Sequence, residues 1–258
     1  MPRRNWTPEE THMAFALYLL LEPSQISKTN ADVISFANAI GRSPSSVALK
    51  LWNISAYDLN RVETGRVGMR HGNKLDRLVW EEYNEGGEDF LAASVDQLKE
   101  TATKHRLEFK ALKPVYAEID STPVGKERTA TVKQRVNQRY FRNSLLKVYE
   151  GRCCITGISA PNLLIASHIK PWAFSDNATE KLSPTNGLLL NALHDRAFDQ
   201  GLMTVTPDYR IHVSKYVKHN QDPLGWLWQF DKQEISLPKS HAPNKELLLY
   251  HNDEVFKG

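Results

Sequence analysis

The deciding stretch runs Cys153-Cys154-Ile155-Thr156-Gly157, then Ala166-Ser167-His168-Ile169-Lys170-Pro171, then Asn186-Gly187-Leu188, then His194-Asp195. This order places a histidine at the end of a short hairpin, an asparagine past a loop, and a second histidine on the helix that follows. Such an order can bring a general base and a metal ligand to one phosphate. Hydrolysis of a phosphodiester bond is therefore the leading hypothesis.

Around this stretch the pattern predicts short strands and one helix. We expect strands at 152–158 and 163–169 around a Ser-Ala-Pro-Asn turn, and a helix over 187–200. A last hairpin is expected from 202–206 and 210–214, around a Pro-Asp turn. The polar tail after Lys215 gives no clear pattern.

The first hundred residues are predicted to be mostly helical. Thr7-Pro8-Glu9-Glu10 combines a cap, a proline suited to the first turn and a capping-box glutamate. That helix should end near Leu21, and Asn30 should cap the next one. The further predicted helices cover 31–40, 45–53, 74–83 and 94–110, with a glycine-rich basic loop at 65–73.

The fold class expected from these elements is α+β. A helical DNA-recognition domain is predicted over 1–110 and a linker with two prolines over 111–132. The second domain is predicted over 133–258. It opens on a basic helix, 133–149, which we expect to contact the DNA backbone, although a solvated face is the alternative.

Composition narrows the class of protein. The chain has 258 residues, a net charge of +3 and 24% charged residues, which permits nucleic-acid binding without requiring it. Its two cysteines are adjacent, so no disulfide framework is expected and a reducing compartment is favoured. Without an apolar leader or a long apolar run, we expect a soluble cytoplasmic protein.

The region from about Gln138 to Val213 resembles the HNH nucleases of the ββα-metal class, on Ser167-His168-Ile169-Lys170-Pro171-Trp172 and the run from Asn186 to Asp199. The resemblance implies that His168 is the general base, Asn186 the central asparagine and His194 a ligand of Mg²⁺ or Mn²⁺. Asp199 is a less certain helper near the metal.

Two features depart from that family pattern. Ser167 stands where many members carry a metal ligand. Many members also hold a zinc with two Cys-x-x-Cys pairs, whereas Cys153 and Cys154 are adjacent and no second pair exists, so no structural zinc is expected. Alternatives stay open: Asn186 can be the N-cap of the helix after it, Asn191 is the rival central asparagine, and Asp199 is equally a cap or ion-pair partner.

The N-terminal part resembles the sulfur-binding domains of type IV restriction enzymes. The resemblance lies in Arg3-Arg4-Asn5-Trp6-Thr7, in the stretch from Gly41 to Leu51, and in the stretch from Leu75 to Tyr83. It implies recognition of DNA in which sulfur replaces a phosphate oxygen. An apolar cup suits the weakly hydrated sulfur, and Pro44 with Val47 is the expected cup. The DNA-binding candidates are Arg3, Arg4, Arg42, Ser43, Pro44, Ser45, Ser46, Val47, Lys50, Arg70 and His71.

The sequence therefore predicts a modification-dependent endonuclease that cuts double-stranded DNA near a phosphorothioate. One HNH site cuts one strand, so a double-strand break requires two events or two protomers, as in a homodimer. One rival is an HNH nuclease that reads methylated bases or a specific sequence. The other is a non-catalytic DNA-binding protein with a degenerate nuclease fold, against which the intact His168, Asn186 and His194 argue.

Overall fold

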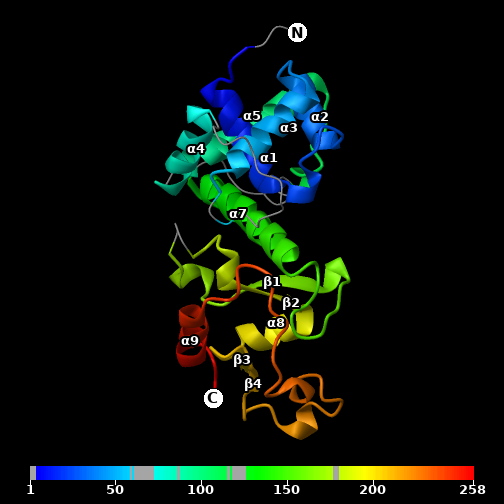
Figure 1. Cartoon of the computed structure of the whole chain (residues 1–258), viewed down its shortest axis with the longest axis vertical. Helices are drawn as coiled ribbons and strands as arrows, with labels where there is room; N and C mark the ends of the chain where they lie inside the picture. Colours follow the sequence, from blue (N-terminus) through cyan, green and yellow to red (C-terminus); the bar gives the residue numbers. More distant parts are fainter. Residues whose placement is uncertain are drawn as a thin grey trace. The chain divides into compact units, whose positions relative to one another are not determined.

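The computed structural model (Figure 1) divides the chain into two compact units, Met1–Tyr140 and Phe141–Gly258. It describes residues 4–58, 60, 73–85, 88–114, 117, 126–176 and 180–258. The first unit is helical and the second combines helices with two small antiparallel sheets, so the predicted α+β class is confirmed. No helix in the described ranges is long and apolar enough to cross a membrane.

Helices packed around one apolar core make up the first unit. The core side chains include Phe15, Leu17, Phe36, Leu51 and Ile54, which have no exposed surface. The helices are α1 (Pro8–Leu20), α2 (Ala31–Ala39), α3 (Pro44–Ser55), α4 (Lys74–Asn84), α5 (Glu88–His105) and α7 (Lys126–Val148), whose last turns belong to the second unit.

Local capping sets where these helices begin. Thr7 accepts a hydrogen bond from the Glu10 N–H, and the Glu10 carboxylate accepts one from the Thr7 N–H, so the predicted capping box is confirmed. Asn30 caps α2 as expected, through Asp32 and Val33. The last two helices start earlier than predicted. Helix α5 begins at Glu88, where a start at 94 was expected, and α7 begins at Lys126, where a start at 133 was expected.

In the second unit a hairpin is followed directly by a helix. Strand β1 (Leu164–His168) pairs with β2 (Gly187–Asn191) so that His168 lies opposite Gly187 and Leu164 opposite Asn191. Helix α8 (Ala192–Asp199) follows β2 without a loop and packs on both strands. Figure 1 shows these three elements side by side.

Two of the predicted elements here were wrong. The predicted helix over 187–200 is a strand as far as Asn191, because the apolar run 188–190 is buried and pairs with β1. The predicted strand over 152–158 is a closed turn, in which Gly157 donates to the Cys153 carbonyl at 2.9 Å and Cys153 donates to that of Ile158 at 2.8 Å.

Gly187 fixes the approach of the hairpin to the end of α7. A Cβ added to this glycine would lie 2.6 Å from Leu145 Cδ1 and 2.7 Å from Phe141 Cζ. Real Cβ contacts are longer than this, so only glycine lets β2 pack so closely on these side chains. The residue opposite Gly187 is His168, which therefore sits on the same packed surface.

The remaining elements complete the second unit. The predicted last hairpin is confirmed as β3 (Met203–Val205) and β4 (Ile211–Val213), and the tail supplies α9 (Lys245–Glu254). Short 3-10 turns of this unit occur at Pro161–Leu163, Trp172–Phe174, Pro184–Asn186, His219–Gln221 and Trp228–Phe230, and the first unit has one at Pro23–Gln25.

His251 of α9 links the tail to helix α8. Its ring stacks on Phe198 of α8 with 3.6 Å between ring centroids, and its Nδ1 lies 2.8 Å from the Thr204 hydroxyl. Burial lowers the pKa of His251 from the ordinary 6.5 to about 4. The folded protein therefore holds this imidazole neutral.

This burial predicts an acid-sensitive second unit. The unfolded chain takes up a proton at His251 near pH 6.5 and the folded chain only near pH 4, so stability falls as the pH drops through that window. The loss reaches about 3 kcal/mol at its acid end. His251→Gln should flatten the dependence of Tm on pH between 7 and 4.5, whereas His212→Gln, at an exposed position on β4, should not. Parallel curves for wild type and His251→Gln would contradict the assignment.

Candidate active site

His168 ends β1 in a defined orientation. Its ring stacks on Phe141 with 3.7 Å between centroids and meets Trp172 edge-on at 5.4 Å. Its Nε2 lies 3.0 Å from the Lys181 carbonyl oxygen, which can only accept, so Nε2 carries the proton and Nδ1 keeps its lone pair. Burial lowers the pKa of His168, against the smaller effect of the Lys181 carbonyl. The ring is therefore neutral at neutral pH, as a general base must be.

Asn186 has no exposed surface and holds the loop between the strands. Its Oδ1 accepts the Lys170 N–H at 2.9 Å, and its Nδ2 lies 3.1 Å from the Ser175 hydroxyl and 3.3 Å from the Glu180 carbonyl oxygen. Its own carbonyl accepts the Ile169 N–H at 3.0 Å. One amide therefore closes the loop directly behind His168, while the N-cap of α8 is Asn191.

His194 lies on the first turn of α8 and is almost fully buried. Asn191 Oδ1 accepts the N–H groups of Leu193 and His194, so its Nδ2 must face the His194 ring, 2.9 Å from Nδ1. On the other side, His194 Nε2 lies 3.0 Å from the Trp226 carbonyl oxygen. Both ring nitrogens thus have protein partners.

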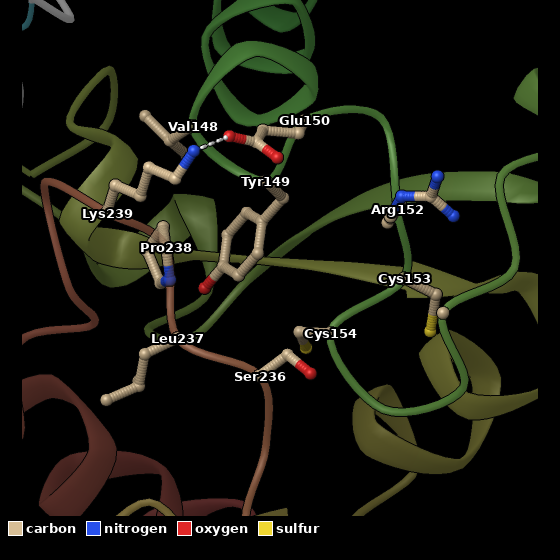
Figure 2. A pocket seen from close by; sticks show the side chains of 11 residues that line it. Val148, Tyr149, Glu150, Arg152, Cys153, Cys154, Ser236, Leu237, Pro238 and Lys239 are labelled. Atoms are coloured by element: carbon tan, nitrogen blue, oxygen red, sulfur yellow. Dashed lines mark ion pairs between the residues drawn. The ribbon is translucent and has the colours of Figure 1, made fainter.

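The two cysteines lie in different surroundings. Figure 2 shows Cys154 close to Tyr149 and Ser236, at a small cavity of about 180 Å³, while Cys153 points away from them. Burial raises the pKa of Cys154 well above its usual range. Burial also raises that of Cys153, but hydrogen bonds with His194 and Thr156 bring its pKa down to about 7. Cys153 therefore lies beside His194, whereas Cys154 does not share that polar environment.

Two carboxylates share one face of α8. Asp195 and Asp199 are one helical turn apart, a spacing that brings side chains together. Burial raises the pKa of Asp195, as does the charge of Asp199, and contact with the buried Ser167 hydroxyl lowers it. Burial raises the pKa of Asp199 too, against the nearby Arg196. Carboxylate oxygens one turn apart on a helix are ligands of the type that a divalent cation prefers.

Comparison with known families found one match for this hairpin and helix. Residues 153–206 match the family model described as HNH endonuclease. These residues carry the pattern of an HNH endonuclease domain, called the HNH domain below. The matched residues contain β1, β2 and α8 and thus His168, Asn186 and His194. Among curated proteins, none matches the chain.

The HNH domain contains one candidate metal ligand, Asp195, that was not predicted from the sequence. Asp195 was overlooked because His194, next to it, carried the family resemblance. The signal was present in the spacing, since Asp195 and Asp199 lie at i and i+4 once α8 is known to begin at Ala192. No group of three His, Cys, Asp or Glu side chains in the described part of the chain is arranged to hold a metal.

Outside the HNH domain, the basic residues near α3 are mostly turned inward. Lys50 forms an ion pair with Asp76, and both side chains are buried. Arg42 pairs with Glu10 at 2.7 Å and stacks over Trp6 at 4.1 Å. Arg42 and Lys50 therefore hold Trp6 and α3 in place in this conformation.

The start of α3 itself is accessible. Ser43 and Ser45 are exposed, Pro44 and Ser46 are half-buried, and the Ser43 hydroxyl accepts the Ser46 N–H at 3.2 Å. Val47 has no exposed surface and supports the turn from beneath. Arg4 is about half exposed and binds Glu10 and the Ile40 carbonyl. Arg3, Arg70, His71, the loop over 65–72 and much of the predicted linker lie outside the described residues.

Proposed function

We propose that the HNH domain hydrolyses phosphodiester bonds of DNA with His168 as the general base. The observation that carries this proposal is the neutral, oriented imidazole at the end of β1. Nδ1 accepts the proton of the attacking water with its lone pair, because the hydrogen bond to the Lys181 carbonyl keeps the ring's own proton on Nε2. Stacking on Phe141 keeps the ring from rotating. Asn186 fixes the loop and does not exchange protons.

HNH nucleases generally use a divalent metal, and the oxygen donors on α8 fit one. Asp195 and Asp199 would hold it, with the Ser167 hydroxyl beside them, because carboxylate and hydroxyl oxygens suit Mg²⁺ or Mn²⁺. When bound, such an ion stabilises charge on the phosphate and on the leaving oxygen. The prediction that His194 is a ligand stays a prediction, and it requires one ring nitrogen to give up its present partner.

The N-terminal unit is proposed to select the substrate, DNA that carries a phosphorothioate. Support comes from the accessible N-terminus of α3, where backbone N–H groups and the helix dipole attract a phosphate. The Pro44 ring adds an apolar surface at that point and lacks an N–H that would favour oxygen. Sulfur is less strongly hydrated than oxygen, so it loses less on contact with this ring.

Substrate choice can be measured on the full chain. Wild type should bind and nick a phosphorothioate duplex in preference to the same unmodified duplex, with Mg²⁺ or Mn²⁺ present. Pro44→Asn should reduce that preference by about fivefold or more, because a hydrated contact loses roughly 1 kcal/mol of discrimination. Arg4→Gln should weaken binding to both duplexes and reduce its dependence on salt.

The matched control is Ser24→Asn, at an exposed position away from α3. Equal affinity of wild type for both duplexes would remove the phosphorothioate proposal and favour the reading of methylated bases or of a specific sequence. Absence of nicking on every duplex, with tight binding retained, would instead point to a degenerate nuclease fold.

A further inference from the structure

Two pairs of residues, each spaced three apart, meet inside the HNH domain. Cys153 and Thr156 lie on the turn before β1, and Asn191 and His194 lie at the start of α8. The turn is closed by the hydrogen bond from Gly157 to the Cys153 carbonyl, with Gly157 at φ +72°. Segments separated by more than thirty residues thus present four polar side chains to one another.

Hydrogen bonds join these four side chains. Asn191 Nδ2 lies 3.3 Å from Thr156 Oγ1 and 2.9 Å from His194 Nδ1. Cys153 lies beside His194 and Thr156, whose polar groups lower the pKa of its thiol. Cys153, Asn191 and His194 are buried, with exposed fractions of 1%, 8% and 2%. Asn191 thus links the two segments through its Nδ2, while its Oδ1 caps α8 and His194 Nε2 is held by the Trp226 carbonyl.

The arrangement has the layout of a structural zinc site. Such sites draw two ligands from each of two segments, with ligands spaced about three residues apart and four corners in all. Here a thiol and an imidazole stand at two corners, while a hydroxyl and an amide, which are poor zinc ligands, stand at the others. Hydrogen bonds already join the two segments and engage both ring nitrogens of His194, so the arrangement is held together without an ion.

We propose that Cys153, Thr156, Asn191 and His194 form a metal-free knuckle, in which hydrogen bonds replace the central ion and hold the start of α8 on the turn. This inference does not depend on the proposed substrate. It makes His194 a positioning residue, because the turn that it anchors carries Asp195. It also predicts that cysteine thiolates in place of Thr156 and Asn191 create a site for Zn²⁺ or Co²⁺.

The experiment replaces the two poor zinc ligands, Thr156 and Asn191, by cysteine. In the full chain, Thr156→Cys with Asn191→Cys should bind one Co²⁺ per chain with the absorption of a tetrahedral thiolate complex. Zn²⁺ should displace that Co²⁺ and raise Tm by roughly 10 °C relative to EDTA. The matched control is Ile155→Cys with Ala192→Cys, which adds the same number of thiols one position away from each corner and should show neither effect.

A second pair of variants keeps the test independent of the Asn191 cap. Thr156→Cys alone leaves that cap in place and should bind Co²⁺ through Cys153, the new thiolate and His194. Thr156→Val removes one hydroxyl from the knuckle without a change of shape, and it should lower Tm by about 4–8 °C.

The proposal is overturned by folded cysteine variants that bind Co²⁺ no better than the control, or by Thr156→Val with the Tm of wild type. It is equally overturned if the wild-type chain itself gives the thiolate absorption with Co²⁺, because hydrogen bonds would then not stand in place of the ion. Loss or retention of nicking in these variants bears on the nuclease proposal separately.

Discussion

His168→Ala should reduce DNA cleavage by about 10²–10⁴-fold, the usual contribution of a general base, while DNA affinity stays near that of wild type. The expectation rests on the buried neutral ring whose Nε2 proton is held by the Lys181 carbonyl. Single-turnover nicking with saturating Mg²⁺ or Mn²⁺ measures the rate, and anisotropy measures affinity. His212→Ala, at an exposed histidine of the same unit, is the control.

The pH dependence gives a second readout of the same residue. The rate must fall as His168 becomes protonated, and burial has moved its pKa below 6.5. The acid limb of the wild-type rate should therefore lie below pH 6.5 and should be absent from the residual rate of His168→Ala. Wild-type rates in His168→Ala would move the base elsewhere and leave His168 as a packing partner of Phe141.

Much of the fold could be predicted because local chemistry decided it. The Thr7 capping box and the Asn30 cap fixed two helix starts without help from distant residues. The last hairpin followed from alternation around a Pro-Asp turn. In each case the residues that stabilise the element lie within it or beside it, so a short stretch of sequence is enough to predict the element.

The stretch 187–200 shows where such reasoning ends. Three consecutive leucines suit either a helix or a buried strand, and only the partner strand decides between them. Because 187–191 pairs with β1 as a strand, the cap of α8 is Asn191 and not Asn186. The helix therefore begins at Ala192, and Asp195 and Asp199 share one of its faces. The position of Cys153 beside His194 and the ion pair of Lys50 with Asp76 also depend on distant segments.

The proposed metal ligands depend on this reassignment of the start of α8, because it places Asp195 and Asp199 one turn apart. Asp195→Asn should raise the Mg²⁺ or Mn²⁺ concentration needed for half-maximal nicking by about 10–100-fold, with the lost rate largely restored by excess metal. The carboxylate that this change removes is the one whose pKa is raised by burial and by the charge of Asp199, so the part of the acid limb that reports its protonation should be absent from Asp195→Asn. Asp253→Asn, on an exposed carboxylate of α9, is the control.

His194→Ala separates the two assignments of the metal ligand. If Asp195 and Asp199 hold the ion, this variant loses the knuckle contacts to Cys153 and Asn191, so its Tm falls and excess metal does not restore its rate. If His194 is a ligand, excess metal restores the rate of His194→Ala, and Asp195→Asn keeps the metal dependence of wild type. That second result would mean that His194 releases the Trp226 carbonyl or the Asn191 amide before it binds metal, because both nitrogens are otherwise engaged.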